Sequence, residues 1–451
     1  MKNRFTLFVL SALLISITFL QLTQCSTKEK TRETVDEAGD PDAWSMSIKN
    51  NADNLFEKGK AVFRFETFGD EAFWTGKLQL HKAIADSKHG GTGNGLAPKD
   101  ALAAGLKVDL TILPEFLKKK INEGKFLDDP LVTLELLKIN AVIGVVGKFD
   151  GKGNLTSVGI TCASCHSTVS SPSGIGSRLD GWANRDLNVG AIVSMAPDLS
   201  IYEELLGVDN ATVKKVLASW GPGKFDAILN LDGKAFRPDG KSAATLIPEA
   251  FGHAGHNLHT WTGGWGDITY WNAYVANLEL QGQGNFYDPR LMNAEQYPVA
   301  SKAGFGNKRN TTENDMVTDK LAALQFYQLA IPSPEAPDSL YDKAAAERGK
   351  YIFDGKAKCV SCHVPPLFTE PGWNTHTPDE ICIDDFQSSR SPDKSYVTQG
   401  LQGLWTHMKG GFYHDGRFAT LMDVVNHYDE CKQLDLTEAE KNDLVQYLLS
   451  L

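Results

Sequence analysis

Two copies of the pattern Cys-x-x-Cys-His constrain this chain more than any other feature of its sequence. One copy spans residues 162–166 and the other spans residues 359–363. In this pattern the two thiols add to the vinyl groups of a haem, and the histidine that follows binds the haem iron from one side. The sequence therefore predicts two covalently bound haem c groups. The predicted attachment and ligand residues are Cys162, Cys165, His166, Cys359, Cys362 and His363.

The same pattern also occurs in zinc knuckles and in thioredoxin-like dithiols. A four-thiolate zinc site needs a further Cys-x-x-Cys pair, and the chain has none besides these two copies. Small residues separate the thiols in both copies. Haem attachment is the interpretation that suits both, and it makes redox chemistry the expected function.

Residues 1–25 have the form of an export signal. Two basic residues precede an apolar core over residues 5–20, which is short for a membrane span. The segment ends at Cys25, which resembles the acceptor cysteine of a bacterial lipoprotein, although Gln24 stands where a small residue is usual. Two outcomes stay open: lipidation of Cys25 with membrane attachment, or cleavage nearby. In either case we expect the protein in the periplasm or on the outer surface of a bacterial membrane.

Cys382 and Cys431 remain once the signal and the two motifs are accounted for. An exported protein folds in an oxidising compartment, where two such thiols commonly pair. We predict a disulfide between them; the alternative is two buried thiols.

The acidic balance of the chain bears on its partners. The net charge is −11 and the isoelectric point is about 5.5. A nucleic-acid partner is therefore not expected, because such partners select basic surfaces. An acidic surface suits a basic redox partner protein, although most acidic charge only keeps a protein soluble.

A short repeat points to the fold class. Residues 57–63 match residues 347–353, each with a glycine followed by an aromatic residue on a helical stretch. In small cytochromes c a helix of this kind opens the domain and crosses the closing helix, where glycine lets the two backbones approach closely. Apolar stripes over residues 314–331 and 436–451 supply the two closing helices. The fold class is mainly α, with two cytochrome c-like haem domains.

The repeat also sets the expected domain boundaries. After the signal, residues 26–45 are a polar tether, the first haem domain covers residues 46–331, residues 332–337 form a proline-rich linker, and the second domain covers residues 338–451. From the repeat glycine to the first motif cysteine is 10 residues in the second domain and 103 in the first. The first domain thus carries a large insertion, with helices expected over residues 114–123 and 130–139, and a glycine-rich loop at residues 90–95. We expect special chemistry there and electron relay in the compact second domain.

The C-terminal segment resembles a known superfamily. His414-Asp415-Gly416, followed by Thr420-Leu421, Val424-Val425 and Tyr428, is similar to the bacterial di-haem cytochrome c peroxidase and MauG superfamily. The resemblance implies one open haem that meets peroxide or oxygen and one six-coordinate haem that moves electrons. It implies Tyr428 as the second ligand of the electron-transfer haem, with His414 as its main competitor and Met408 behind both. Met195 is a further methionine to consider as a ligand.

The first domain resembles the rubber oxygenase branch of the same superfamily, on fewer residues. Tyr270-Trp271 and Phe286 match, in order and spacing, an aromatic pair and a later phenylalanine that line an oxygen-binding pocket. Trp271 also qualifies as an electron bridge between the haems; the alternative is that these aromatic residues only pack against a porphyrin edge. Glu279 is a candidate acid–base group for peroxide, against the alternative of a solvated loop glutamate.

Two further groups of side chains carry open alternatives. His253, His256 and His259 are spaced by three and suit a metal ion or the open face of the first haem; the alternative, which we favour, is loop histidines that face solvent or a haem propionate. Arg178, Arg185 and Arg417 are candidates to neutralise propionates, with salt bridges at the surface as the alternative.

These features predict an exported, peroxidase-like di-haem oxidoreductase whose first haem reacts with peroxide or oxygen. One alternative is a non-catalytic electron carrier in which both haems are six-coordinate. Another is a haem dioxygenase that acts on an apolar substrate. The expected partners are a redox protein and peroxide, oxygen or another small molecule.

Overall fold

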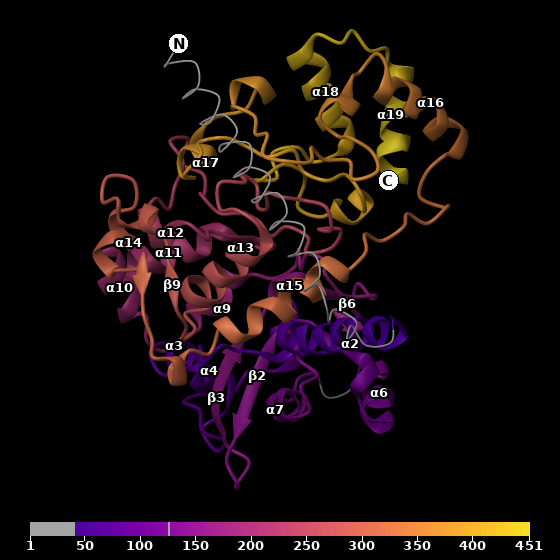
Figure 1. Ribbon diagram of the computed structural model, residues 1–451. Coiled ribbons are helices and arrows are strands. Elements are labelled where there is room, and N and C mark those ends of the chain that lie inside the picture. The colour runs from indigo at the N-terminus through magenta and orange to yellow at the C-terminus, as the bar shows by residue number, and fades with distance from the viewer. Residues whose placement is uncertain (1–40, 125–126) are drawn as a thin grey trace, which may run out of the picture. The chain divides into compact units, whose positions relative to one another are not determined.

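The computed structural model of this chain describes residues 41–124 and 127–451 (Figure 1). The predicted export signal and most of the predicted tether lie outside the described residues. The chain divides into two compact units, up to Asn54 and from Leu55 to Leu451. The described part of the first unit is the beginning of helix α2 (Pro41–Phe65), and all other elements belong to the second. Within the described ranges, no helix is both long and apolar enough to span a bilayer.

The architecture is mainly α, as predicted, with short helices joined by long loops. Helices before the linker are α3 (Glu71–Trp74), α4 (His81–Ile84), α5 (Pro98–Ala103), α6 (Glu115–Asn122), α7 (Pro130–Lys138), α8 (Ala163–His166), α9 (Val189–Ser194), α10 (Ser200–Leu206), α11 (Asn210–Trp220), α12 (Leu229–Asp232), α13 (Ile268–Tyr274), α14 (Pro298–Ala303) and α15 (Leu321–Ala330). Helices after it are α16 (Lys343–Asp354), α17 (Phe386–Ser389), α18 (Leu421–Lys432) and α19 (Glu438–Ser450).

Single turns and short strands complete the fold. The 3-10 turns are η2 (Leu110–Ile112), η4 (Pro289–Met292), η5 (Thr312–Asn314), η6 (Thr318–Lys320), η7 (Cys359–Ser361), η8 (Asp379–Ile381) and η9 (Leu404–His407), and η3 (Val275–Glu279) is a π-turn. The strands are β1 (Val108–Asp109), β2 (Val145–Phe149), β3 (Leu155–Ile160), β4 (Ser167–Val169), β5 (Ile175–Gly176), β6 (Arg178–Asp180), β7 (Lys224–Phe225), β8 (Thr245–Leu246), β9 (Phe286–Tyr287) and β10 (Asn307–Lys308). Five two-stranded pairs form: β1 with β5 in parallel, and antiparallel β2–β3, β4–β6, β7–β8 and β9–β10.

The repeated glycines lie at two helix crossings, as the sequence predicts. A Cβ atom built on Gly59 would lie 1.9 Å from the Ala323 carbonyl oxygen of α15. A Cβ atom built on Gly349 would lie 2.0 Å from the Asp443 carbonyl oxygen of α19. Only glycine permits backbones to pack this closely. Figure 1 shows the second crossing, where α16 and α19 lie against each other beside α18.

The two closing helices form near their expected places. Helix α19 begins at a capping box, in which the side chains of Thr437 and Glu440 bind each other's backbone N–H groups. Helix α15 begins at Leu321, seven positions after the expected start, because the preceding residues form the separate turns η5 and η6. It ends before Pro332, which cannot continue a helix.

The inserted segment builds much of the wall of the first site. Helices α6 and α7 match the helices expected there, and residues 90–95 form a loop. Apolar side chains of the insertion pack with those of α9 and α11 in one large core cluster. Buried ion pairs join the residues after α11 to the C-terminal part of the chain. Arg390 Nε lies 2.8 Å from Asp232 Oδ2, and Arg390 Nη2 lies 3.0 Å from Asp226 Oδ1. The expected domain boundaries at residues 332–337 remain predictions.

Candidate haem sites

The first Cys-x-x-Cys-His motif presents its histidine in a defined orientation. The motif follows strand β3, and its last residues form the single-turn helix α8. His166 Nδ1 lies 3.0 Å from the Pro248 carbonyl oxygen, so this nitrogen donates its hydrogen there. The Nε2 atom is then the one left free to bind a metal, which is the usual arrangement for a ligand histidine.

The second motif repeats the arrangement in an unrelated local structure. It begins on the 3-10 turn η7, and His363 Nδ1 lies 2.9 Å from the Phe368 carbonyl oxygen. Burial lowers the pKa of His166 and of His363, so both rings are neutral at neutral pH, as ligation requires. All four motif cysteines are free thiols.

Each motif lines its own cavity. The first cavity is walled by apolar side chains of the insertion, of α9 to α11 and of the loop before α13, and the second by side chains of α16, α18 and α19. Cys162, Cys165 and His166 line the first, while Cys359, Cys362 and His363 line the second. Two thiols and a neutral imidazole at the wall of a largely apolar cavity are what a covalently attached haem requires.

Glu279 is a half-buried acid at the wall of the first cavity. It ends the π-turn η3, a rare local structure that is frequent at functional sites. Its Oε1 accepts a hydrogen bond of 3.1 Å from the Tyr274 hydroxyl, while its Oε2 is buried without a partner among the described residues. Burial raises the pKa of Glu279 well above its ordinary value. The alternative of a solvated loop glutamate is therefore wrong.

The predicted aromatic group is only partly brought together. Trp271 lines the first cavity, whereas Tyr270 and Phe286 are not part of its lining. Successive helix residues point about 100° apart, so Tyr270 turns away and packs on Phe286 at a ring-centroid distance of 5.7 Å. The Tyr270 hydroxyl binds Asp288 instead. The expectation that Tyr270 and Phe286 line this pocket is not met.

A different tryptophan lies where the two cavities approach each other. Trp261 lines both cavities and donates a hydrogen bond of 3.1 Å from Nε1 to the Leu246 carbonyl oxygen. Trp271 does not line the second cavity. No local sequence pattern distinguishes Trp261 from Trp265 and Trp271, which follow it closely in the chain.

The second cavity gathers the predicted ligand candidates with one exception. Tyr428 from α18 and His414 both line it, and the His414 ring stacks on Tyr396 at 5.4 Å. Met408 is 50% exposed and lies outside the lining, so it is not placed as a ligand. The methionine is exposed because it follows turn η9 in a surface loop.

Tyr413 is a candidate that sequence reasoning missed. It lines the second cavity immediately before His414, and its ring centroid lies 6.3 Å from that of Tyr428. Its backbone has a φ of +66°, an uncommon value for a side chain of this size. Its place next to the His-Asp-Gly sequence was the signal available.

The three arginines have different surroundings. Arg185 lines the second cavity, and its Nε and Nη1 atoms are buried without hydrogen-bond partners in the described part of the chain. It therefore suits a haem propionate. Arg178 is buried beside Asp109, with 3.2 Å from Nε to Oδ2, and Arg417 binds Asp415 and Asp384. Neither of these two lines a cavity, so the propionate role does not extend to them.

Comparison with known proteins supports the resemblance to di-haem peroxidases that the C-terminal segment indicates. No protein-family model matches the chain. "Methylamine utilization protein MauG" of Methylorubrum extorquens is 27% identical over 218 residues, which are 42% of this chain and 61% of that protein. "Cytochrome-c peroxidase IdrP1" of Denitromonas iodatirespirans is 24% identical over 246 residues, 40% of this chain and 64% of that protein. Both relatives are similar to this chain over part of its length, and their names agree with the resemblance to the cytochrome c peroxidase and MauG superfamily.

The matches cover only part of each superfamily relative. The chain spans 61% and 64% of the lengths of these two proteins. Among solved structures, hydrazine synthase of Kuenenia stuttgartiensis is 19% identical, covering 48% of this chain and 76% of that chain, at a TM-score of 0.29. A MauG-like protein associated with microbial copper homeostasis is 20% identical, covering 49% and 76%, also at a TM-score of 0.29. Scores this low support no comparison of folds.

The three loop histidines lie together in a small pocket of their own. His259 is 5% exposed, and the ring centroids of His253 and His259 are 4.7 Å apart. Burial lowers the pKa of His253 to about 3 and that of His259 to about 4. The expectation that these histidines face solvent is therefore wrong for His259.

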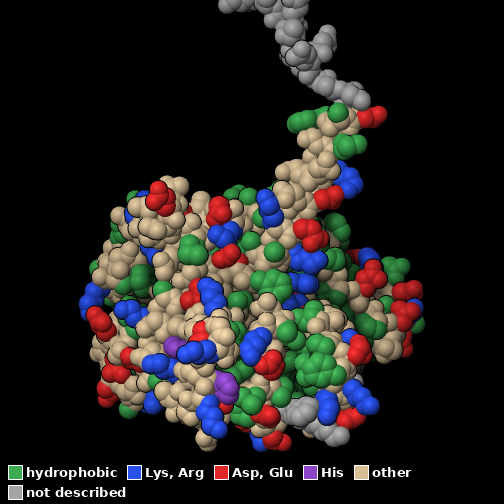
Figure 2. Space-filling model, turned by 90° about the horizontal axis from the view of Figure 1, so that it is seen from below, with side chains coloured by type: hydrophobic (Ala, Val, Ile, Leu, Met, Phe, Trp, Pro, Cys, Tyr) green, Lys and Arg blue, Asp and Glu red, His purple; other side chains and the backbone are tan. Residues whose placement is uncertain are grey.

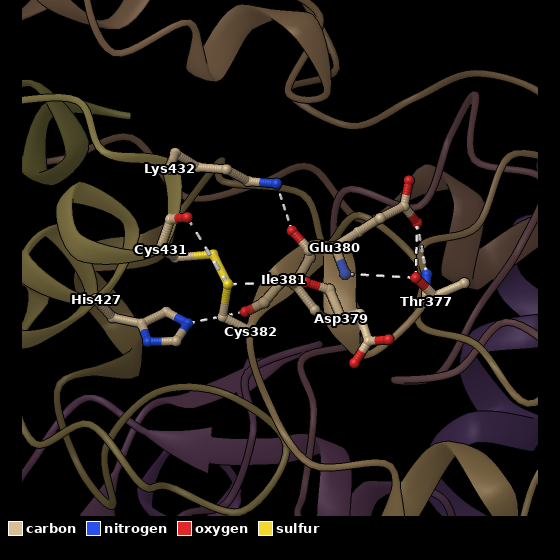
Figure 3. Close-up of a disulfide and its surroundings, with 8 residues drawn as sticks. All are labelled: Thr377, Asp379, Glu380, Ile381, Cys382, His427, Cys431 and Lys432. Carbon is tan, nitrogen blue, oxygen red and sulfur yellow. Dashed lines mark hydrogen bonds between the residues drawn. A yellow bond between two sulfur atoms is a disulfide. The ribbon is translucent and has the colours of Figure 1, made fainter.

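The predicted disulfide is present. Cys382 and Cys431 are bonded, with their Cα atoms 5.9 Å apart (Figure 3). Beside it, His427 Nε2 donates a hydrogen bond of 2.8 Å to the Ile381 carbonyl oxygen, and Lys432 binds the carbonyl oxygen of Glu380. These contacts attach turn η8 to α18, the helix that carries Tyr428 into the second cavity.

One face of the molecule shows how its surface charge is distributed. On the face shown in Figure 2, basic and acidic side chains are interspersed over the described surface. The net negative charge therefore marks no docking area for a redox partner on that face.

Proposed function

We propose that this protein is an exported di-haem oxidoreductase of the peroxidase type. The haem on His166 meets peroxide or oxygen, and the haem on His363 exchanges electrons with a redox partner protein. One observation carries the proposal: Glu279 lines the first cavity, and its carboxyl oxygen Oε2 has no hydrogen-bond partner among the described residues. The second cavity instead gathers aromatic hydroxyls and an imidazole, which are side chains that occupy a sixth coordination position.

Glu279 supplies the proton transfer that this chemistry needs. When bound on His166, a haem would supply electrons for cleavage of an oxygen–oxygen bond. Cleavage of that bond also requires one group to move a proton from one oxygen to the other. The Tyr274 hydroxyl holds Glu279 Oε1, so Oε2 is the atom that carries and transfers the proton. Burial raises the pKa of Glu279 above that of a surface glutamate, which favours its action as a proton-transfer group.

The second site is proposed as the relay. Tyr413, Tyr428 and His414 are its candidate sixth ligands, and the buried Arg185 neutralises a propionate there. Trp261 lines both cavities, which makes it the proposed path for electrons between them in place of Trp271.

Titration of the holoprotein with carbon monoxide when reduced, and with cyanide when oxidised, tests this division. We expect one of the two haems to bind the ligand. His166→Gly should abolish that binding and leave the spectrum of the second haem largely intact. Two low-spin haems that bind neither ligand would overturn the proposal in favour of an electron carrier.

A dioxygenase acting on an apolar substrate is a second candidate. The first cavity continues away from its motif along apolar side chains of the insertion, such as Leu80, Ile84 and Leu137, and faces Val213 and Leu217 of α11. These apolar side chains suit contact with an apolar substrate. Assays of product formation distinguish the two candidates. A peroxidase forms product from peroxide and a reduced donor, whereas a dioxygenase forms product from oxygen and an olefin.

A further inference from the structure

A third pocket, next to the haem cavities, is lined by three histidines of a single loop. His253, His256 and His259 all line it, together with the carboxylate residue Glu249. The ring centroids are 4.7 Å apart for His253 and His259, and 6.3 Å apart for each of the other two pairs. Three imidazoles therefore share one small space.

Nitrogen atoms in this space lack partners. Neither ring nitrogen of His259 has a hydrogen bond within residues 41–124 and 127–451, although the residue is 5% exposed. The buried Nε2 of His256 likewise has none there. Buried polar atoms without partners cost free energy, so their presence points to a bound group.

The loop is held in place by its backbone. The His256 N–H donates to the His253 carbonyl oxygen at 3.1 Å, and the His259 N–H donates to the Gly266 carbonyl oxygen at 3.1 Å. Gln399, from the C-terminal part of the chain, donates to the Thr260 carbonyl oxygen at 2.9 Å. These contacts fix the backbone positions from which the three rings extend.

Another cluster in the described part of the chain already has its ligand atoms close together. Atoms of Cys362, Glu370 and His376 lie within 4.8 Å of one another. Its members have other roles, because Cys362 is a motif thiol and Glu370 Oε2 accepts bonds from His376 and Thr398 at 2.6 and 2.7 Å. It is not the better metal site.

We propose that His253, His256 and His259 bind a divalent late first-row transition-metal ion, Zn²⁺ or Cu²⁺. Imidazole nitrogen is the protein ligand best suited to these ions, and three of them with one open position form a common site. Glu249 lines the pocket and supplies negative charge nearby. The rival occupant is a propionate of the first haem, which would accept hydrogen bonds from the imidazole N–H groups.

The pocket lies where the walls of both haem cavities meet. It shares His166 and Trp271 with the first cavity, and Thr398 and Gln399 with the second. A bound ion would join the histidine loop to this shared wall without being part of either haem.

Metal content of the full-length holoprotein tests the proposal. The protein is dialysed against a chelator, loaded with Zn²⁺ or Cu²⁺, freed of excess ion and analysed for metal against iron. We expect one added ion for every two iron atoms, and nitrogen hyperfine structure in the electron paramagnetic resonance of the Cu²⁺ form. His253→Ala and His259→Asn should each lose the ion while keeping both haems.

His89→Ala is the matched control, because His89 binds Asp86 on a different loop at 2.8 Å. It should bind the ion as the parent does. Absence of uptake by the parent protein would overturn the proposal, as would equal uptake by all variants. A changed spectrum or loss of the first haem in His259→Asn, with metal uptake unchanged, would assign the pocket to a propionate instead.

Discussion

At the scale of single residues, two carboxyl groups near the first haem site behave differently from surface acids. Glu279 and Asp70 both have raised pKa values, and burial is the main cause for each. A buried acid with a raised pKa either takes part in function or only lowers the stability of the folded state. Substitution distinguishes the two.

Glu279→Gln should lower the rate of peroxide turnover by roughly 10²- to 10⁴-fold, the usual contribution of a positioned acid–base group. The amide keeps the size of the side chain and its contact with Tyr274 but cannot move a proton. Stopped-flow measurement of peroxide consumption checks this. Glu295→Gln, at an exposed glutamate, should leave the rate unchanged. An unchanged rate in Glu279→Gln would remove Glu279 from the mechanism.

Asp70→Asn should stabilise the protein, increasingly as pH rises. Asp70 is fully buried and burial raises its pKa to about 9, while the unfolded chain loses the proton near its ordinary value. Between these two pKa values the folded state holds one more proton, so wild-type stability falls with pH by up to about 1.4 kcal/mol per unit. The amide removes this dependence. Urea unfolding at pH 5 and pH 8 measures this dependence. An equal fall in the free energy of unfolding of the parent protein and of Asp70→Asn would contradict the raised pKa of Asp70.

At the scale of elements, close helix crossings and one covalent link hold the second haem site together. Helices α16 and α19 meet at Gly349, and the disulfide joins turn η8 to α18. The two features are independent of each other, and each can be removed separately.

Gly349→Ala should lower the free energy of unfolding by about 1–3 kcal/mol. The added methyl group would lie 2.0 Å from the Asp443 carbonyl oxygen, so the helices must separate. Thermal unfolding of the holoprotein measures the effect. Gly151→Ala is the control, since a Cβ atom there meets nothing within 4 Å among the described residues. Equal melting temperatures for the two variants would contradict the crossing.

Replacement of both Cys382 and Cys431 by serine should cost about 2–4 kcal/mol, as for a disulfide that closes a loop of this size. Because the disulfide fixes the helix that bears Tyr428, the spectrum of the second haem should change more than that of the first. Denaturant titration followed separately at the two haems tests both expectations. An equal spectral change at both haems would show that the disulfide does not specifically stabilise the second haem site.

At the scale of the whole molecule, the two cavities communicate through the residues between them. Trp261 lines both, whereas Trp271 lines only the first. The path between the sites is a property of the tertiary structure, because no local sequence pattern distinguishes these two tryptophans.

Trp261→Phe should slow the exchange of electrons between the two haems by at least tenfold, whereas Trp271→Phe should leave it near the parent rate. Phenylalanine keeps much of the packing but has no easily oxidised indole ring. Flash photolysis of the carbon monoxide complex of the half-reduced protein measures the exchange. The reverse order of effects would restore Trp271 as the bridge.

Several features could be predicted because their cause lies in a short stretch of chain. The helix crossings follow from a glycine within a helical pattern, and the capping box of α19 follows from Thr437 and Glu440. The start of α15 was less certain, because turns and helices compete over the residues before Leu321. Met408 was misjudged since exposure depends on loops that no local pattern describes.

The sequence by itself determined the two predicted haem attachment points, the mainly α character and the pairing of Cys382 with Cys431. These depend on adjacent residues or on a small number of thiols. Only the tertiary structure decided that Glu279 Oε2 is buried, that Trp261 rather than Trp271 lines both cavities, and that Tyr413 joins Tyr428. The physical reason is that a cavity wall is assembled from segments far apart in the chain, so the direction of each side chain is set by packing rather than by its neighbours.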